Sequence, residues 1–189
     1  MWMFLVAVVA AFLFSFALTR YLATPGSLGF VLDQPNHRSM HTTPTPRSGG
    51  FAFVLVLLFA AGLSAALGQL GGACTLALAR LAGVSYVDYR GGLAVRWRLL
   101  AHLIAAGLLV AEFRDVMPVL VPGLGAVVGA VLAFFATVWL INLYNFMDGM
   151  DGFSGGMAVF GFGALAVVGI LAGQPYYAGF WAVVAAAVA

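Results

Sequence analysis

Charge is what this sequence lacks most. It contains no lysine, and charged residues make up 7% of its 189 residues, whereas about 25% is usual for soluble domains. Hydrophobic residues account for 64% of the chain, and its mean hydropathy is +1.09. So few charged side chains cannot cover a water-exposed surface. The composition therefore excludes an ordinary soluble domain and indicates an integral membrane protein.

Cysteine is nearly absent as well. Cys74 is the single cysteine, so an intrachain disulfide is excluded, and neither the redox compartment nor a cysteine-based metal site can be read from it. A small buried apolar residue is the simplest interpretation. All eight basic residues are arginines, and they form no motif typical of nucleic-acid binding. We attribute the basic pI of about 9.0 to loop arginines that face an anionic lipid leaflet.

Long apolar runs fill the rest of the chain. A bilayer core about 30 Å thick is crossed by roughly 20 apolar helical residues. Suitable runs lie at residues 2–18, 51–68, 71–87, 99–111, 119–141, 157–173 and 176–189. They are continuous, unlike the short alternating strands of a membrane barrel. We therefore predict an all-α, polytopic transmembrane helix bundle of about six to seven spans, forming a single integral-membrane domain over residues 1–189.

The arginines predict the orientation of these spans, because short cytoplasmic loops are rich in basic residues. Six arginines fall on one side if the N-terminus lies outside, and only Arg114 falls on the other: Arg20, Arg38, Arg47, Arg90, Arg96 and Arg98. Residues 21–50, 88–98 and 142–156 should then share the cytoplasmic face. Arg80 lies inside a predicted span, where a charge is costly, so we expect it near a cavity or a tilted helix end.

Residues 142–156, "NLYNFMDGMDGFSGG", place polar groups at every third position: Asn142, Asn145, Asp148 and Asp151. On a helix such residues line one side, and the glycines that follow favour a break near the aspartates. Carboxylate and amide oxygens suit Mg²⁺, which binds one or two carboxylates together with substrate phosphates. Asp148 and Asp151 are thus candidate metal ligands. A polar helix end capped by Asn and Asp explains the same composition equally well.

Residues 33–50, "DQPNHRSMHTTPTPRSGG", form a long polar loop. Arg38 and Arg47 could bind phosphate oxygens in bidentate fashion, and His37 and His41 could donate hydrogen bonds or titrate near neutral pH. The alternative is an interfacial loop whose arginines only fix the topology. No third ligand supports a zinc site.

Residues 86–103, "YVDYRGGLAVRWRLLAHL", join two predicted spans. Asp88 ends one span, and Arg96, Arg98 and His102 begin the next, so an acid and several cations should meet at one surface. Arg98 and His102 are four residues apart and share a helix face. The simpler alternatives are arginines that snorkel at a span end and a histidine that is a satisfied packing residue.

In this order, the segments 33–50, 87–102 and 142–156 together resemble the polyprenyl-phosphate N-acetylhexosamine-1-phosphate transferase family. The resemblance is greatest to undecaprenyl-phosphate N-acetylglucosaminyl-1-phosphate transferases and O-antigen initiating enzymes. Phospho-N-acetylmuramoyl-pentapeptide transferase looks like a more distant relative. The resemblance runs from about Asp33 to Gly156, and its last motif is the most specific.

The resemblance implies a Mg²⁺-dependent enzyme of the bacterial inner membrane, with its active face in the cytoplasm. A polyprenyl phosphate would attack a UDP-amino sugar such as UDP-N-acetylglucosamine and release UMP, for cell-envelope polysaccharides such as lipopolysaccharide. It implies catalytic roles for Asp88, Asp148 and Asp151, with the last two at the metal. The implied cofactor- and substrate-binding residues are Asn142, Asn145, Arg38, His41 and Arg47.

Two departures from the family pattern stand out. Tyr89 occupies the place of a second acid after Asp88, and a phenol, which stays protonated at neutral pH, cannot replace a carboxylate. Family members also have further spans, with another aspartate and a His- and Arg-bearing loop. The chain thus resembles an N-terminal portion, inactive alone or completed by a second half or by a homo-oligomer. The alternatives are a small transporter that binds a cation at Asp148 and Asp151, or a non-catalytic protein that binds lipid phosphate.

Overall fold

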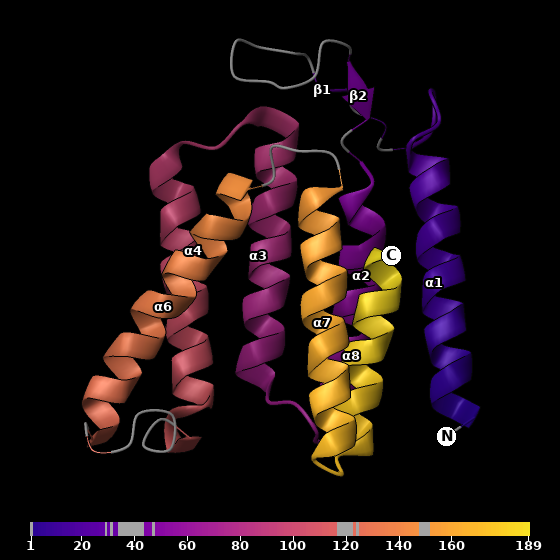
Figure 1. The fold of residues 1–189 in the computed structure, drawn as a ribbon. Helices are drawn as coiled ribbons and strands as arrows, with labels where there is room; N and C mark the ends of the chain where they lie inside the picture. Colours follow the sequence, from indigo (N-terminus) through magenta and orange to yellow (C-terminus); the bar gives the residue numbers. More distant parts are fainter. Residues whose placement is uncertain are drawn as a thin grey trace. The chain divides into compact units, whose positions relative to one another are not determined.

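The computed structural model describes residues 2–28, 30, 32–33, 44–46, 48–116, 123, 125–147 and 152–189, with the backbone alone at 33 and 145–147. These residues form the helices α1 (Trp2–Leu22), α2 (Gly50–Ala66), α3 (Gly72–Gly91), α4 (Val95–Glu112), α6 (Gly125–Met147), α7 (Phe153–Leu171) and α8 (Pro175–Val188) (Figure 1). A two-residue antiparallel pair, β1 (Leu32–Asp33) and β2 (Thr45–Pro46), precedes α2, and a 3-10 turn, η1 (Arg114–Val116), follows α4.

Each predicted span corresponds to one of these helices, which confirms the prediction of an all-α membrane helix bundle. Three of the described helices are long and apolar enough to cross a membrane, namely α1, α6 up to Tyr144, and α7. Helices α2 and α8 are apolar but shorter, and α3 and α4 carry charged residues along their lengths. Helices α3 and α4 therefore contain most of the charged residues that the structure describes.

The helix boundaries differ from the predicted spans where polar residues continue a helix. Helix α4 begins at Val95 rather than at residue 99, because arginine is a good helix former and need not lie in a loop. Helix α6 extends to Met147 and so includes Asn142. Arg80 is exposed near the middle of α3, so the expected helix end is wrong there, and the alternative of a nearby cavity stays a prediction.

The chain divides into two compact units, which are described separately. The first consists of Met1–Ala60 and Met147–Ala189, and the second of Ala61–Phe146. The single domain predicted over residues 1–189 stays a prediction.

In the first unit, α8 packs against α1. The hydroxyl of Ser15 in α1 donates a hydrogen bond to the carbonyl oxygen of Ala187 at 2.5 Å. Around it, Ala11, Val56 and Ala187 form a buried cluster from α1, α2 and α8. Lipid tails are as apolar as these side chains, so close packing and hydrogen bonds between helices hold such an assembly together.

Helix α8 also packs closely against α7 in the same unit. A Cβ atom at Gly169 would lie 2.8 Å from the backbone nitrogen of Ala178, so only glycine fits between the two backbones. Phe162 of α7 stacks on Trp181 of α8, with ring centroids 5.3 Å apart. One small residue and one aromatic pair thus fix the contact between these helices.

In the second unit, α3 and α4 form an antiparallel hairpin. Buried alanines lie along its two helices: Ala77, Ala101, Ala105 and Ala106. At the end away from the α3–α4 connection, the backbone N–H of Ala73 donates to Oε2 of Glu112 at 3.1 Å. A carboxylate is favourable there because the N-terminus of a helix carries partial positive charge.

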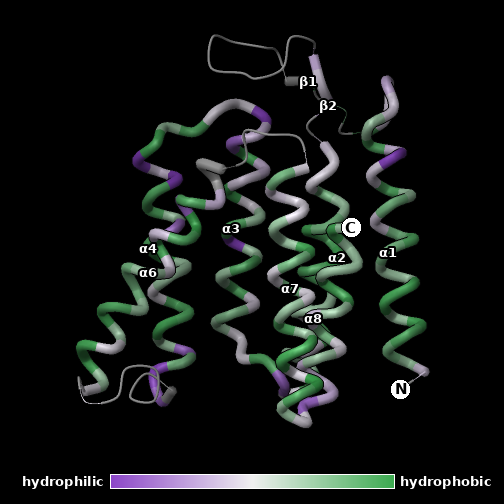
Figure 2. Tube along the Cα trace, viewed as in Figure 1, coloured by the Kyte–Doolittle hydropathy of each residue, from purple (hydrophilic) through white to green (hydrophobic). Residues whose placement is uncertain are grey.

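Helix α6 lies close to α4 in the second unit, where a Cβ at Gly107 would be 3.9 Å from the ring of Phe134. Its C-terminal end lies at the same end of this unit as the α3–α4 connection (Figure 1). Figure 2 shows that hydrophilic residues gather at this connection, whereas the middle of α4 is largely hydrophobic. The α3–α4 turn is therefore a polar end of the second unit, next to a largely apolar middle.

Candidate functional site

The α3–α4 connection is built around Gly92. Helix α3 ends at Gly91, and Gly92 adopts a left-handed φ of 71°, with its N–H donating to the carbonyl oxygen of Asp88 at 2.8 Å. Glycine adopts a positive φ without the steric strain that other residues meet there, so it suits the point where α3 ends. The chain then reverses, and α4 begins at Val95.

Asp88 lies at the centre of this turn. Its Oδ1 accepts a hydrogen bond from the backbone N–H of Leu93 at 2.5 Å. Its Oδ2 faces Nη1 of Arg98 at 3.4 Å, and the two side chains are 28% and 37% exposed, respectively. The prediction that an acid and a cation meet at this surface is confirmed.

Both members of this ion pair occupy unfavourable positions in their own helices. Asp88 is in the last turn of α3 and Arg98 is in the first turn of α4, whereas helix dipoles favour cations at C-termini and anions at N-termini. Each side chain thus needs the opposite charge of the other, or of an equivalent partner, to offset its unfavourable interaction with the dipole of its own helix. Sites that break a local rule in this way are often functional.

His102 lies one turn beyond Arg98 in α4. Its Nδ1 atom is buried and has no hydrogen-bond partner among the described residues. The interpretation of His102 as a satisfied packing residue is therefore wrong for this atom. Tyr89, which stands where the resemblance implies a second acid, is partly buried in α3.

Two further arginines near this turn pair with aromatic rings. Nη1 of Arg90 donates to the hydroxyl oxygen of Tyr86 at 3.1 Å, and its guanidinium carbon lies 5.8 Å from the centre of that ring. The guanidinium carbon of Arg96 lies 5.6 Å from the ring centre of Trp97. Both arginines are exposed.

Asn142 lies in α6 and is exposed. Its Nδ2 donates to the carbonyl oxygen of Val138, one turn earlier, at 2.8 Å, so its Oδ1 is the atom that remains for an external donor or a cation. Asn145 lies in the last turn of the same helix, but its side chain is outside the described residues.

Asp148 and Asp151, the predicted metal ligands, lie outside the described residues. The predicted break near them is confirmed at its two borders. Helix α6 ends at Met147, and Gly152, with a left-handed φ of 71°, caps the start of α7.

The predicted binding residues of the long loop also lie outside the described residues: Arg38, His41 and Arg47. The ends of this loop are described. Leu32 pairs with Pro46 in the antiparallel β1–β2 ladder, and the buried hydroxyl of Ser48 donates to the carbonyl oxygen of Leu22 at 3.2 Å. The loop thus starts and finishes at one place, beside the C-terminal end of α1.

No group of three or more His, Cys, Asp or Glu side chains that could hold a metal ion gathers within the described part of the chain. Asp88 offers hard oxygen atoms, which Mg²⁺ prefers, but each of them already has one donor, Leu93 N–H or Arg98. Asp88 by itself is thus suited to a supporting position beside a metal–phosphate site. Asp148 and Asp151 stay the predicted metal ligands.

Among the described residues of the predicted site, Asp88 contacts Arg98. Asn142 lies in the C-terminal part of α6, which ends at the same end of the second unit as the α3–α4 turn (Figure 1). Sequence reasoning missed the contribution of Leu93, because its backbone N–H carries no side-chain signal. The glycine pair Gly91 and Gly92, which predicts a tight reversal after Asp88, was the available indication.

Comparison with known proteins agrees with these features. The model of glycosyl transferase family 4 matches residues 71–189. The chain is 31% identical over 171 residues to decaprenyl-phosphate N-acetylglucosaminephosphotransferase of Mycobacterium tuberculosis (strain ATCC 25618 / H37Rv), covering 82% of this chain and 42% of that protein. The protein of the same name from Mycobacterium leprae is 30% identical over 165 residues, covering 76% and 41%.

The chain thus spans about two fifths of the length of the curated relatives it matches. No solved structure matches it. The match of the family model covers more than half of the chain and includes the Asp88–Arg98 turn. The chain therefore belongs to glycosyl transferase family 4, the polyprenyl-phosphate N-acetylhexosamine-1-phosphate transferases that its motifs resemble.

Proposed function

We propose that the protein transfers a sugar 1-phosphate from a UDP-N-acetylhexosamine to a polyprenyl phosphate. The products are a polyprenyl-diphosphate sugar and UMP, and the reaction serves cell-envelope polysaccharide synthesis at the cytoplasmic face of a bacterial inner membrane. Family membership and the names of the mycobacterial relatives support this reaction class. The choice of UDP-N-acetylglucosamine as donor rests on those names alone.

The observation that carries the proposal is the placement of Asp88. An acid in the last turn of one helix and an arginine in the first turn of the next destabilise their own helices. The second unit nevertheless holds them 3.4 Å apart at the α3–α4 turn. Binding of an anionic substrate to Arg98 explains why the two charges occupy these positions despite their unfavourable interactions with the helix dipoles.

The chemistry of the pair fits a phosphate substrate. A guanidinium carries five N–H donors in a planar fork, so Arg98 can face Asp88 with one edge and bind a phosphate oxygen with another. Asp88, held by the Leu93 N–H, fixes the orientation of the fork. We assign Asp88 and Arg98 the binding and positioning of the lipid phosphate.

We further propose that Asp148 and Asp151 hold Mg²⁺, with Asn142 and Asn145 near the nucleotide and Arg38, His41 and Arg47 contacting substrate phosphates. A bound divalent cation neutralises phosphate charge and stabilises the charge that develops during phosphoryl transfer. Asn142 supports its assigned place, because the internal hydrogen bond to Val138 leaves its carbonyl oxygen available.

The test is release of UMP by purified protein incubated with UDP-N-acetylglucosamine, undecaprenyl phosphate and Mg²⁺. We expect UMP only when all three are present, and loss of UMP with EDTA. Asp88→Asn and Arg98→Gln should each lower the rate at least about a hundredfold, and Asp115→Asn, at an exposed ion pair elsewhere, should leave it unchanged.

Because the chain spans about two fifths of its relatives, the assay includes a second arm. The protein is co-expressed with the remaining part of the Mycobacterium tuberculosis relative as a separate polypeptide. No UMP in either arm, while the intact relative is active under the same conditions, would overturn the proposal.

A further inference from the structure

We propose that the α3–α4 turn carries a second binding surface, which anchors the second unit to anionic phospholipid head groups. The surface consists of two exposed arginines, Arg90 and Arg96, with their aromatic partners Tyr86 and Trp97; we call it the outer arginine surface. It is distinct from the Asp88–Arg98 pair and does not depend on the proposed transferase reaction.

Helix geometry separates the two sets of arginines. Arg90 is two residues beyond Asp88 in α3, and Arg96 is two residues before Arg98 in α4, which places each about 200° around its helix from the inner pair. Asp88 and Arg98 face each other between the helices, so Arg90 and Arg96 point away from that contact. The two ion pairs found in the described part of the chain, Asp88–Arg98 and Arg114–Asp115, include neither of them.

The aromatic partners hold the outer arginines close to the helix surface. Tyr86 accepts a hydrogen bond from Arg90, and the ring of Trp97 lies under the guanidinium of Arg96. Tyr86 and Trp97 are themselves 44% and 52% exposed. Amphipathic rings of this kind are enriched where a membrane meets water, because one part is apolar and the other polar.

The surroundings favour a lipid head group over a soluble ligand. Three arginines against one carboxylate leave two positive charges at this turn. Beside them, Val87 and Val95 are 54% and 70% exposed, so cations and unprotected apolar side chains occupy the same surface. An anionic phospholipid supplies both a phosphate for the arginines and acyl chains for the valines. The open surface does not enclose a free phosphate ion.

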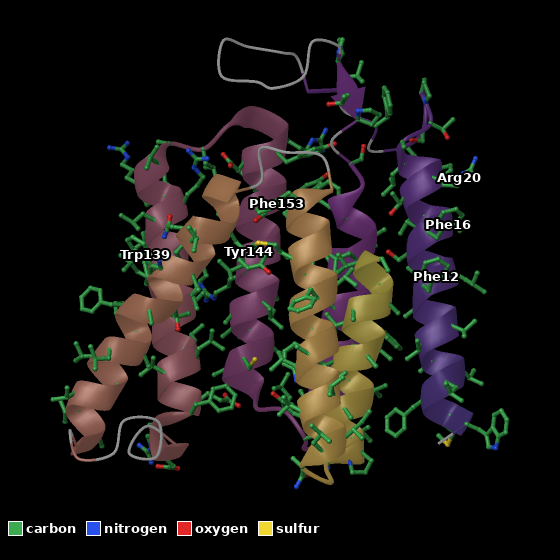
Figure 3. All side chains as sticks on the ribbon, in the orientation of Figure 1. Phe12, Phe16, Arg20, Trp139, Tyr144 and Phe153 are labelled. Carbon is green, nitrogen blue, oxygen red and sulfur yellow. The ribbon has the colours of Figure 1, made fainter. Side chains whose placement is uncertain are left out.

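A similar pairing occurs at the end of α1, in the first unit. Phe12, Phe16 and Arg20 follow one another along this helix (Figure 3). The guanidinium carbon of Arg20 lies 5.7 Å from the centre of the Phe16 ring. An arginine resting on an aromatic ring near a helix end thus recurs on an apolar helix long enough to cross a membrane.

The experiment compares phospholipid retention by native mass spectrometry of the purified protein in mixed micelles, with phosphatidylglycerol or phosphatidylcholine as the probe. At low ionic strength, one arginine near a membrane surface favours binding to an anionic lipid over a zwitterionic lipid by about fivefold. We therefore expect the double variant Arg90→Gln/Arg96→Gln to lose up to about twenty-five-fold in its preference for phosphatidylglycerol. The preference of the unaltered protein should fall as salt is added.

Three controls keep the proposal falsifiable. Arg114→Gln, at an exposed arginine of the same unit, should retain the preference. Arg90→Lys/Arg96→Lys should retain most of it, because the charge is kept. Helical circular dichroism of every variant verifies folding. An unchanged preference in the double glutamine variant, or an equal loss in Arg114→Gln, would refute the surface.

A final arm separates bulk phospholipid from the proposed substrate. Retention of undecaprenyl phosphate by the double glutamine variant should stay within about twofold of the unaltered protein after correction for net charge. If the variant lost undecaprenyl phosphate but kept its phosphatidylglycerol preference, the outer arginines would belong to the substrate site and the proposal would be wrong. A failed transferase assay has no bearing on this result.

Discussion

Asp88 joins three parts of the α3–α4 turn. Its carbonyl oxygen accepts the N–H of Gly92, its Oδ1 accepts the N–H of Leu93, and its Oδ2 faces Arg98. A buried or half-buried N–H that loses its acceptor costs free energy that a solvated group does not. The residue proposed to position the substrate therefore also stabilises the turn that carries it.

We expect Asp88→Ala to lower the free energy of unfolding by about 1–2 kcal/mol, mostly through the lost acceptor of Leu93 N–H. The half-exposed ion pair adds little. Thermal unfolding in detergent, followed by circular dichroism, measures the change. The matched control is Asp115→Ala, because Arg114 and Asp115 are also 3.4 Å apart but 79% and 91% exposed; it should have no measurable effect. Equal losses in the two variants would contradict the assigned role of Leu93.

At the residue scale, the sequence predicted the contact between two side chains, Asp88 and Arg98, but not the hydrogen bond from the backbone N–H of Leu93. Asp88 ends one predicted span and Arg98 begins the next, which was sufficient to place them at one surface. The donor from Leu93 depends on the φ of Gly92. The Nδ1 of His102, which has no partner in the described part of the chain, depends on packing between helices. Neither follows from residue spacing.

Among the elements, the packing of α7 on α8 depends on one glycine. A Cβ at Gly169 would lie 2.8 Å from the nitrogen and 2.9 Å from the Cα of Ala178, both backbone atoms. Backbone atoms cannot rotate away as a flexible side chain would, so a larger residue separates the helices. Gly163, on the same helix, has no atom within 4 Å of the position that a methyl group would occupy.

Gly169→Ala should therefore destabilise the protein by about 1–3 kcal/mol, the usual cost of overpacking. Gly163→Ala should be neutral or slightly stabilising, since alanine has the higher helix propensity. Thermal melting of both variants in the same detergent is the measurement. A melting temperature of Gly169→Ala equal to that of the unaltered protein would show that the two helices are not held at this distance.

The existence of the helices could be predicted from apolar run length, because each run is long enough to span a bilayer and has few charges. Their ends could not, because arginine and asparagine continue a helix as readily as they end one in this chain. The start of α6 shows the opposite effect. Gly123 and Gly125 have left-handed φ values of 88° and 76°, so the predicted span from residue 119 to 141 was too long at its beginning.

At the scale of the whole molecule, the predicted topology places the N-terminus outside. In a Cys74→Ala background, Leu28→Cys lies in the described segment after α1, and Gln69→Cys lies between α2 and α3. We expect a membrane-impermeant maleimide to label position 69 from outside intact cells and position 28 only in inverted vesicles. The reverse labelling pattern would invert the topology and remove the cytoplasmic placement of Asp88.

Composition and three motifs predicted the membrane class and the family, both of which are confirmed. The site could be predicted only in part, since sequence order does not tell which helices approach one another. Asp88 and Arg98 meet because they flank one short turn. The roles of Asp148 and Asp151 rest on the family resemblance and stay predictions.

The alanine-lined contact between α3 and α4 has a consequence for how a lipid reaches Asp88. A carboxylate stabilises each end of this contact. Glu112 accepts a hydrogen bond from the N–H of Ala73 at one end, and Asp88 accepts one from the N–H of Leu93 and pairs with Arg98 at the other. Ala77 and Ala105 are each 1% exposed, so the two helices pack closely where these alanines lie. For the polyprenyl phosphate proposed as substrate, we therefore expect the isoprenoid tail to lie outside the α3–α4 contact, with its phosphate at the α3–α4 turn.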